Sequence, residues 1–549
     1  MKNLDVRQPV TSTFQADQNL RSLVSQTMFH HIDGIAIGST VWALLSGGVF
    51  DILTSSDSPV NIRSLAKLTG RREGFLNVAL RLLAHQGFLR LSGDMDSGKK
   101  SVSITDVGTD WLEYVHFYEQ IPRISDQTSH LRAIFEKKPV HDNFDSALPI
   151  TPNHKSDFSL AHRVSLHMNG EIMAVIMTEL SVRGINDRDP IVALDDVTHN
   201  RRVSGFIADI LASHSWGKIC EEGIRLSEAG NLASQWAPQY YYPVSYLSTF
   251  RKVPRLISGD ESIPCPGGSS TDETHVDRSL DIKFSGIVFD RTCRRPFLEI
   301  VLPIFDREPL EEQPAGIVDT GSGDGTLLVE LSRAIREHTL RGRLMDSFPL
   351  AFVGVEYTQV AAEATKSALI IAGVPFARAV SGDIGHPDGI ARTLVNEGID
   401  PENALHVNKS VIHNRTYKTP VCKNSTLGWK PLSQAPFVAP NGELIRPRDL
   451  ECNLIEFFEA WKPLCRRHGM VVVEAHTADP ELVCLKIGHN IITCMDATHG
   501  YSGQLLIEYE AFSRILEFTG YRVSAYRTLS GKIVGKPTMT IHHLIPMNS

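Results

Sequence analysis

Three glycines at every second position, next to an acid, form the part of the sequence best suited to hold a ligand. They follow the apolar run at 316–318, which is too short for a helix and fits a buried strand. Without a Cβ, a glycine lets the backbone turn tightly and lie close to a ligand. The helix predicted at 326–335 begins directly afterwards and offers unpaired N–H groups to a negatively charged group. The cofactor-binding residues predicted here are Asp319, Gly321, Gly323, Asp324 and Gly325.

Two further acids end the next two predicted strands. The run at 350–357 carries Glu356 near its end, where βαβ nucleotide folds hold a ribose diol. The run at 379–384 carries Asp383 in the same place. Together with the glycines, these acids predict an adenosine-containing cofactor, either a dinucleotide or S-adenosylmethionine. The alternative is a glycine turn that only connects a strand to a helix. The further cofactor residues predicted are Glu356, Tyr357, Gly382, Asp383, Ile384 and Asn408.

Several histidines stand where acid–base or metal chemistry is to be expected. His476 follows the predicted strand at 470–473, and His499 precedes a glycine in a predicted polar loop. His413 follows an apolar run and is a candidate general base. Iron or manganese is bound better by imidazole together with oxygen ligands than by thiolate ligands. For each histidine alone, the alternative is an ordinary hydrogen-bonded residue. The candidate catalytic residues are His413, His476 and Tyr501, and the candidate metal ligands are His476, His499 and Gln504.

Composition limits the classes of function. The chain has 549 residues, 42% of them hydrophobic, and a formal net charge of −8. It therefore lacks the excess of basic residues that is typical of nucleic-acid-binding proteins. Its eight cysteines stand singly, which argues against a zinc knuckle or a disulfide framework. No apolar run reaches membrane-spanning length, and residues 1–20 lack a hydrophobic signal region. We expect a cytoplasmic protein with reduced thiols and no nucleic-acid or membrane partner.

The first part of the chain reads as a winged-helix-like unit. It has predicted helices at 37–53 and 72–85, followed by a predicted hairpin at 88–105. DNA binding is one interpretation, but Arg71 and Arg72 alone do not make a phosphate-binding face. We favour a helical dimerisation or scaffold module. The sequence leaves a homodimer open.

A fainter copy of this unit follows, so an internal repeat is predicted. The amphipathic segment at 201–213 precedes residues 219–233, which resemble 102–112: each has a short strand, a Ser or Thr, an acid and then a glycine before a helix. The predicted domains are 1–135, 136–272 and 273–549, the last being the α/β cofactor core. Residues 416–453 form a long, proline-rich connector that we expect to cap the substrate site.

The C-terminal half resembles a known family of methyltransferases. The glycine turn with its preceding acid is similar to that of class I methyltransferases. The combined motifs resemble the metal-dependent C-methyltransferase domains of polyketide synthase loading modules, of the apratoxin type. The motifs are His275-Val-Asp-Arg278, Ser285-Gly286, Glu299-Ile-Val-Leu, Gln313 to Gly325, Gly382-Asp-Ile, Leu405 to Arg415, Glu474-Ala-His476 and Thr498 to Gln504.

The resemblance implies a fold, a donor and a metal. It implies an α/β fold with a class I, Rossmann-like core and helical lid domains, S-adenosylmethionine as donor, and one metal ion beside the methyl group. The sequence departs from the family at two places. Ile287 stands where that family tends to have a histidine, and Asn408-Lys409 replaces a more usual Arg-Ser pair. These departures put the substrate in doubt.

Methyl transfer to carbon needs a carbanion-like nucleophile, held in line with the methyl group by the protein. A base must create it, or a Lewis acid must stabilise the enolate. We therefore expect a C-methyltransferase acting on the α carbon of a malonyl-type acyl group, presented by a carrier protein or as a small molecule. One alternative is an O- or N-methyltransferase of a small aromatic metabolite. Another is a winged-helix DNA-binding regulator with an S-adenosylmethionine-sensing core.

Overall fold

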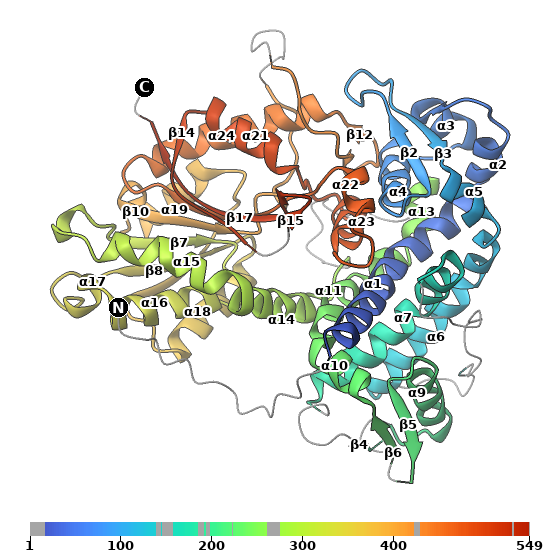
Figure 1. The fold of residues 1–549 in the computed structure, drawn as a ribbon. Coiled ribbons are helices and arrows are strands. Elements are labelled where there is room, and N and C mark those ends of the chain that lie inside the picture. The colour runs from blue at the N-terminus through green and yellow to red at the C-terminus, as the bar shows by residue number, and fades with distance from the viewer. Residues whose placement is uncertain are drawn as a thin grey trace.

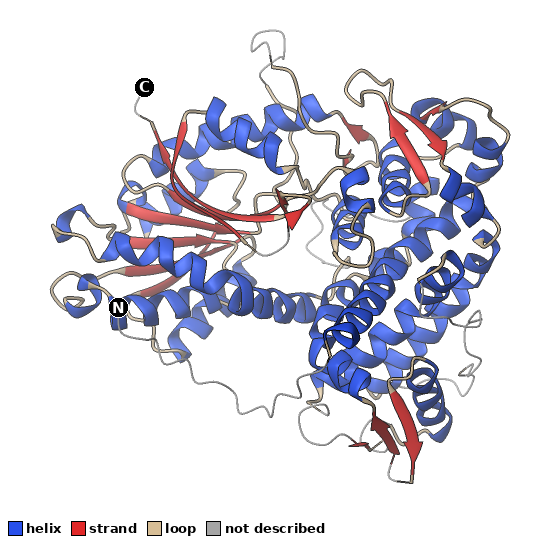
Figure 2. Ribbon diagram, viewed as in Figure 1, coloured by secondary structure: helices blue, strands red, loops and turns tan. Residues whose placement is uncertain are grey.

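The computed structural model places a helical N-terminal half beside an α/β C-terminal half. Helix α14 (Arg278–Val288) leads from one half to the other (Figure 1). Strands gather mainly in the C-terminal half (Figure 2). The structure describes residues 17–138, 144, 158–184, 191–193, 198–221, 223–260, 275–421, 429–529 and 532–547.

A seven-stranded sheet forms the C-terminal half, in the order β14-β17-β13-β10-β7-β8-β9. Only β17 runs antiparallel to its neighbours, and the others are parallel to one another. This order confirms the predicted α/β core. Its strands are β7 (Gly316–Thr320), β8 (Ala351–Glu356), β9 (Ala377–Ser381), β10 (Ala404–Lys409), β13 (Met470–Ala475), β14 (Tyr521–Thr528) and β17 (Met539–Pro546).

Helices cover both faces of this sheet, which explains why its central strands are apolar throughout. Successive strand residues point to opposite faces, so Ile317 joins one apolar cluster and Val318 the other. The first cluster is covered by α15 (Arg294–Val301), α16 (Thr326–His338) and α18 (Gln359–Ile371). The second is covered by α19 (Pro387–Asn396), α21 (Pro447–Cys465) and α24 (Tyr509–Phe518).

The N-terminal half begins with a longer helix than the sequence predicts. The predicted helix at 37–53 is in fact the end of α1 (Gln18–Ser46) followed by the separate helix α2 (Val49–Thr54). Gly48 adopts a φ of 67°, a left-handed conformation that interrupts the helix between α1 and α2. The earlier part of α1 escaped prediction because polar residues such as His31 and Asp33 occupy buried positions on it, which hides its apolar pattern.

The predicted repeat is confirmed in the order of its elements. In the first copy, β1 (Val60–Asn61), β2 (Leu89–Ser92) and β3 (Ser101–Ile104) form a sheet in the order β1-β3-β2. The second copy has β4 (Ile191–Val192), β5 (Gly217–Cys220) and β6 (Gly223–Leu226) in the matching order β4-β6-β5. Their helices are α3 (Ile62–Thr69), α4 (Glu73–His85), α5 (Asp106–Leu112) and α6 (Ile121–Phe135), then α7 (Leu160–Val182), α9 (Arg201–Ser213) and α10 (Glu228–Trp236).

The C-terminal half returns to pack against the first copy. Helices α22 (Pro480–Cys484) and α23 (Ile492–Tyr501) lie on α4, as does the small hairpin of β11 (Phe437–Val438) and β12 (Leu444–Ile445) (Figure 1). Cys494, Ala497 and Tyr501 even belong to the apolar core of the N-terminal half. In the part of the chain that the structure describes, no helix combines the length and the apolar character that crossing a membrane requires.

Candidate functional site

The glycine turn after β7 has the open, tightly bent form that its sequence predicts. Gly321, Gly323 and Gly325 adopt φ angles of 77°, 58° and 77°, which favour glycine. A Cβ on Gly321 would lie 2.3 Å from Cγ1 of Val411, so any other residue would clash. A Cβ on Gly323 would meet nothing within 4 Å, so this glycine leaves open space above the turn. The turn therefore presents bare backbone to a ligand.

Asp319 lies at the base of this turn with an unused hydrogen-bonding atom. Its side chain is buried, and Oδ1 has no partner among the residues that the structure describes. Burial raises the pKa of Asp319 to about 7, and the positive charge of Lys409 opposes that rise. A buried acceptor without a donor is costly unless a ligand supplies one. Asp319 thus fits a cofactor that brings a hydrogen-bond donor.

Glu356 reaches the same turn from the end of β8. One carboxylate oxygen accepts hydrogen bonds from the Gly323 backbone N–H and, at 3.2 Å, from Ser322 Oγ. Burial raises the pKa of Glu356, although these two hydrogen bonds lower it. Asp324 is exposed and accepts from the Thr326 N–H at 3.0 Å, at the start of α16. The turn and Glu356 are therefore held together before any ligand arrives.

The remaining predicted cofactor residues lie after β8, after β9 and within β10. Asp383 accepts from the Gly385 N–H and from His386 Nδ1, each at 2.8 Å. Asn408 is fully buried, and its Oδ1 has no partner among the described residues. Neighbouring parallel strands end at one edge of the sheet, where open α/β sheets bind ligands. The other three behave differently: Tyr357 is exposed, the Gly382 N–H donates to the Glu356 carbonyl, and the Ile384 carbonyl accepts from Trp461 Nε1.

A buried histidine–carboxylate pair lies beyond β10 and at the end of β13. His413 Nδ1 donates a hydrogen bond to Glu474 Oε1, and both side chains are buried. Burial raises the pKa of Glu474, but the charge and hydrogen bond of His413 outweigh it, so the net shift is downward. Glu474 is thus ionised at neutral pH and fixes the tautomer of His413. The nitrogen of His413 that does not face Glu474 is Nε2.

His499 lies against this pair, but on a helix. The sequence placed it in a polar loop, and that prediction was wrong: His499 is in α23, whose residues are nearly all buried, so no apolar stripe marks it as a helix. Its ring centroid is 4.8 Å from that of His413. His499 Nδ1 donates to the Met495 carbonyl at 2.7 Å, which leaves Nε2 with the lone pair. Burial and the charge of His413 lower its pKa to about 3, so the ring is neutral.

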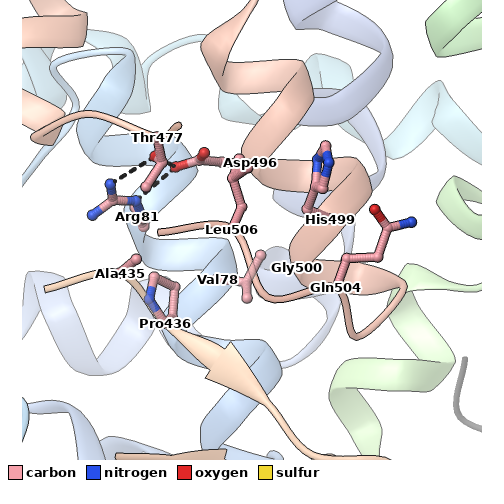
Figure 3. Close-up of a pocket in the computed structure, with 10 residues that line it drawn as sticks. All are labelled: Val78, Arg81, Ala435, Pro436, Thr477, Asp496, His499, Gly500, Gln504 and Leu506. Carbon is pink, nitrogen blue, oxygen red and sulfur yellow. Dashed lines mark hydrogen bonds and ion pairs between the residues drawn. The ribbon is translucent and has the colours of Figure 1, made fainter. Parts of the chain in front are cut away.

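Two small cavities adjoin these histidines. One, with about 280 Å³ of empty space, has His499 and Gln504 at one end and the Arg81–Asp496–Thr477 group at the other (Figure 3). Ala435 and Pro436, in the segment expected to cap the substrate site, also line it. The second, of about 200 Å³, is lined by apolar residues together with His413, Arg415 and Glu474. The two cavities lie next to the histidine pair, one beside His499 and the other beside His413.

The structure does not bring all candidate residues to these cavities. His476 is fully buried elsewhere, with Nε2 2.8 Å from Thr540 Oγ1 and its ring against Phe512. The Tyr501 hydroxyl lies 2.9 Å from Thr40 Oγ1 of α1. Gln504 does line the first cavity, and its Nε2 donates to the Tyr246 hydroxyl at 3.2 Å. Among the described residues, no three His, Cys, Asp or Glu side chains form a group that could hold a metal.

The sequence alone does not assign a role to several residues of the site. Glu474 had a signal, because it ends a buried strand as Asp319 does, but its partner was not foreseen. Tyr242 lies in an aromatic segment that also reads as packing, and its hydroxyl contacts Thr498 and His499. Arg81 had no signal, since single arginines on a helix are common, and Arg415 ends the motif Leu405 to Arg415 but had no predicted role.

Arg81 joins the N-terminal half to the helix that carries His499. Its Nε donates to Asp496 at 2.7 Å, with both side chains under a tenth exposed, and its Nη2 donates to Thr477 and to the Ala478 carbonyl. Arg81→Gln leaves a buried carboxylate unpaired, so we expect a loss of about 3–5 kcal/mol in the free energy of unfolding, measured by urea denaturation.

The matched control is Arg63→Gln, which removes the more exposed pair of Arg63 with Glu73 at 3.3 Å. That change should cost at most about 1 kcal/mol. Equal losses for the two variants would show that Arg81 does not join the two halves in this way.

Two protein-family models match parts of the chain. Residues 273–529 match the model of the AprA MT2-like domain family, and residues 24–91 match that of the AprA N-terminal domain. A search of curated proteins found no match.

Solved structures similar to the chain include methyltransferases of more than one kind. The CurJ carbon methyltransferase is 11% identical, covering 68% of this chain and 93% of its own, with a TM-score of 0.34. The mitomycin 7-O-methyltransferase MmcR is 14% identical, covering 69% and 96%, with a TM-score of 0.39. An O-methyltransferase family 2 protein from Planctomyces limnophilus, in complex with apigenin, is 10% identical, covering 95% and 96%, with a TM-score of 0.34.

Proposed function

We propose that this chain, whose residues 273–529 match the AprA MT2-like domain family, transfers the methyl group of S-adenosylmethionine to a carbon atom. The observation that carries the proposal is the buried His413–Glu474 pair, which lies at the carboxyl edge of the sheet that also holds the glycine turn. A carbon acceptor needs such a base, because its proton must leave before the carbon can attack.

Some residues of the site hold the cofactor, and others prepare the acceptor for methyl transfer. Bound S-adenosylmethionine supplies a methyl group on a positively charged sulfur. Asp319 and Glu356 bind its polar groups, and the bare backbone at Gly323 admits it closely. The apolar lining of the second cavity limits water around His413.

His413 begins the reaction by taking the proton from the acceptor carbon on Nε2. Glu474, ionised and hydrogen-bonded to Nδ1, stabilises the imidazolium that forms. The electron pair left on carbon attacks the methyl group in line, a new C–C bond forms, and the methyl–sulfur bond breaks with its electrons staying on sulfur. The proton on His413 then returns to solvent, which restores the base.

We further propose a malonyl-type acyl group as the acceptor, presented by a carrier protein or as a small molecule. The α carbon of such a group lies between two carbonyls and is acidic enough for a histidine base. Arg415 supports this class of acceptor: it is buried beside His413, and its Nη2 has no partner among the described residues. Nε and Nη1 are occupied by Asn453 and the Ile412 carbonyl, so Nη2 is the nitrogen left for a carboxylate.

Product analysis tests the acceptor directly. The protein would be incubated with S-adenosylmethionine and either a malonyl thioester or a small aromatic hydroxyl compound, and mass spectrometry would locate the added methyl. Methyl on the α carbon of the malonyl compound is the expected result. Methyl on oxygen, with the malonyl thioester unchanged, would overturn the proposal in favour of an O-methyltransferase.

We also propose that a metal ion assists, with His499 and Gln504 as ligands. Both line one cavity, and His499 is neutral with its Nδ1 pinned by a backbone carbonyl, as is usual for a metal-binding histidine. His476, the third candidate ligand, is not in that cavity. Nitrogen and oxygen donors suit iron or manganese. The ion would act as a Lewis acid for the acceptor's carbonyl oxygens.

Removing the metal is therefore expected to slow methyl transfer. Turnover would be measured after treatment with a chelator and again after iron or manganese is added back, with recovery expected on addition. His499→Ala serves as the matched variant, because its remaining turnover should no longer respond to either treatment. Full turnover in the chelated wild-type protein would exclude the metal role and leave His413 as the sole activating group.

A further inference from the structure

The two copies in the N-terminal half match one another residue by residue at their turns. Thr105 Oγ1 accepts from the Gly108 N–H at 2.9 Å, and Ser227 Oγ accepts from the Gly230 N–H at 3.1 Å. A Cβ on Gly108 would lie 2.0 Å from the Phe88 carbonyl oxygen. A Cβ on Gly230 would lie 1.8 Å from the Trp216 carbonyl oxygen. Both glycines are thus required by the same close approach, which identifies the copies as repeats of one fold.

The long helices of the two copies, α1 and α7, cross each other in a reciprocal way. A Cβ on Gly34 of α1 would lie 2.3 Å from His167 Cα of α7. A Cβ on Gly170 of α7 would lie 2.3 Å from the His31 carbonyl oxygen of α1. Each helix therefore brings a glycine to the point where it meets the histidine of the other. A side chain at either glycine would clash with the backbone of the other helix.

The same histidines make a reciprocal pair of buried hydrogen bonds. His31 Nδ1 of the first copy lies 2.9 Å from the Tyr240 hydroxyl of the second. His167 Nδ1 of the second copy lies 2.8 Å from the Tyr118 hydroxyl of the first. In a two-fold symmetric dimer, residue i of one subunit contacts j of the other and j contacts i. The two copies show this pattern within one chain.

Among the described residues of the two copies, only those of the first line the first cavity, whereas the second copy contacts His499 and Gln504 through the hydroxyls of Tyr242 and Tyr246. Arg81 is the ninth residue of α4, and its ion pair with Asp496 lines the first cavity. The ninth residue of α9, the matching helix, is Asp209, which is exposed. An acid there could not form the same pair with Asp496. The second copy instead packs α7 along α1, whose Thr40 contacts Tyr501 of the helix that carries His499.

We infer that residues 158–260 take the place of a partner subunit, so that the chain is a monomer with one active site and its own built-in dimer contact. The face of α1 that a second chain would need is covered by α7. The second copy packs against α1 and stabilises its position, and α1 in turn contacts α23. This inference rests on the contacts within the N-terminal half and not on the proposed reaction.

Light scattering of the full-length protein over a wide range of concentration tests the inference. We expect the mass of one chain throughout, whether or not the protein proves to methylate carbon. A dimer mass at any concentration in that range would overturn the inference, whichever face the dimer used.

A complementation experiment gives a second, independent readout. Arg81→Asp and His413→Ala variants would be co-expressed and purified together. If two such chains exchanged their N-terminal halves, the unchanged N-terminal half of the His413→Ala chain would pack against the unchanged core of the Arg81→Asp chain. If each chain pairs within itself, the mixture stays as inactive as the two variants apart. Restored turnover, or a mixed dimer on light scattering, would show that the contact forms between chains.

Discussion

Replacing His413 by alanine is expected to lower turnover by roughly 10²–10⁴-fold, the usual contribution of a general base, while S-adenosylmethionine binding stays as it is. The cause is local: His413 is hydrogen-bonded to Glu474 and lines the cavity offered to the acceptor, whereas the glycine turn does not depend on it. Turnover would be measured with a methyl-transfer assay and cofactor binding by calorimetry on the same protein.

Two further variants separate a base from a merely structural histidine. Glu474→Gln keeps the shape of the pair but removes the charge that stabilises protonated His413, so turnover should fall with cofactor affinity retained. His338→Ala changes an exposed histidine at the end of α16 and should alter neither quantity. If His413→Ala kept wild-type turnover, or lost cofactor binding in proportion to activity, the assignment of His413 as the base would be wrong.

Replacing Glu356 by alanine is expected to weaken S-adenosylmethionine binding roughly tenfold to a hundredfold. Hydrogen bonds to a charged group are worth about 1.5–3 kcal/mol each. Glu356 accepts one from the Gly323 N–H, and in our proposal it accepts others from the cofactor. Isothermal titration with S-adenosylhomocysteine measures the change without any need for the acceptor.

Glu363→Ala is the matched control, because Glu363 is an exposed acid on the neighbouring helix α18. Its removal should leave the affinity unaltered. Equal affinities for the Glu356 and Glu363 variants would mean that the cofactor is held somewhere other than this turn.

The cofactor half of the site could be predicted because its signals are local. A strand, a glycine turn and a helix follow one another in the chain, so spacing alone indicates Gly321 to Gly325, and the acid at the end of β8 comes with the next strand. The roles of these glycines and of Glu356 in cofactor binding stay predictions until binding of a cofactor to the protein is measured.

The catalytic half could not be predicted to the same depth, because it depends on contacts far apart in the chain. His413 comes from the loop after β10 and Glu474 from β13, and Arg81 meets Asp496 from the other half of the molecule. His476 looked like the better ligand because it follows a strand, yet that strand turns its side chain towards Thr540. Helix α23 is buried from both halves, so its sequence carries no stripe that marks it as helix.

Deuterium exchange at the acceptor's α carbon tests the central claim most directly. A malonyl thioester would be placed in heavy water with the protein and S-adenosylhomocysteine, and loss of the α proton would be followed by nuclear magnetic resonance. The account predicts exchange faster than in a protein-free blank, and exchange at the blank rate with His413→Ala. Equal exchange rates for the wild-type protein and His413→Ala, alongside normal methylation by both, would contradict it.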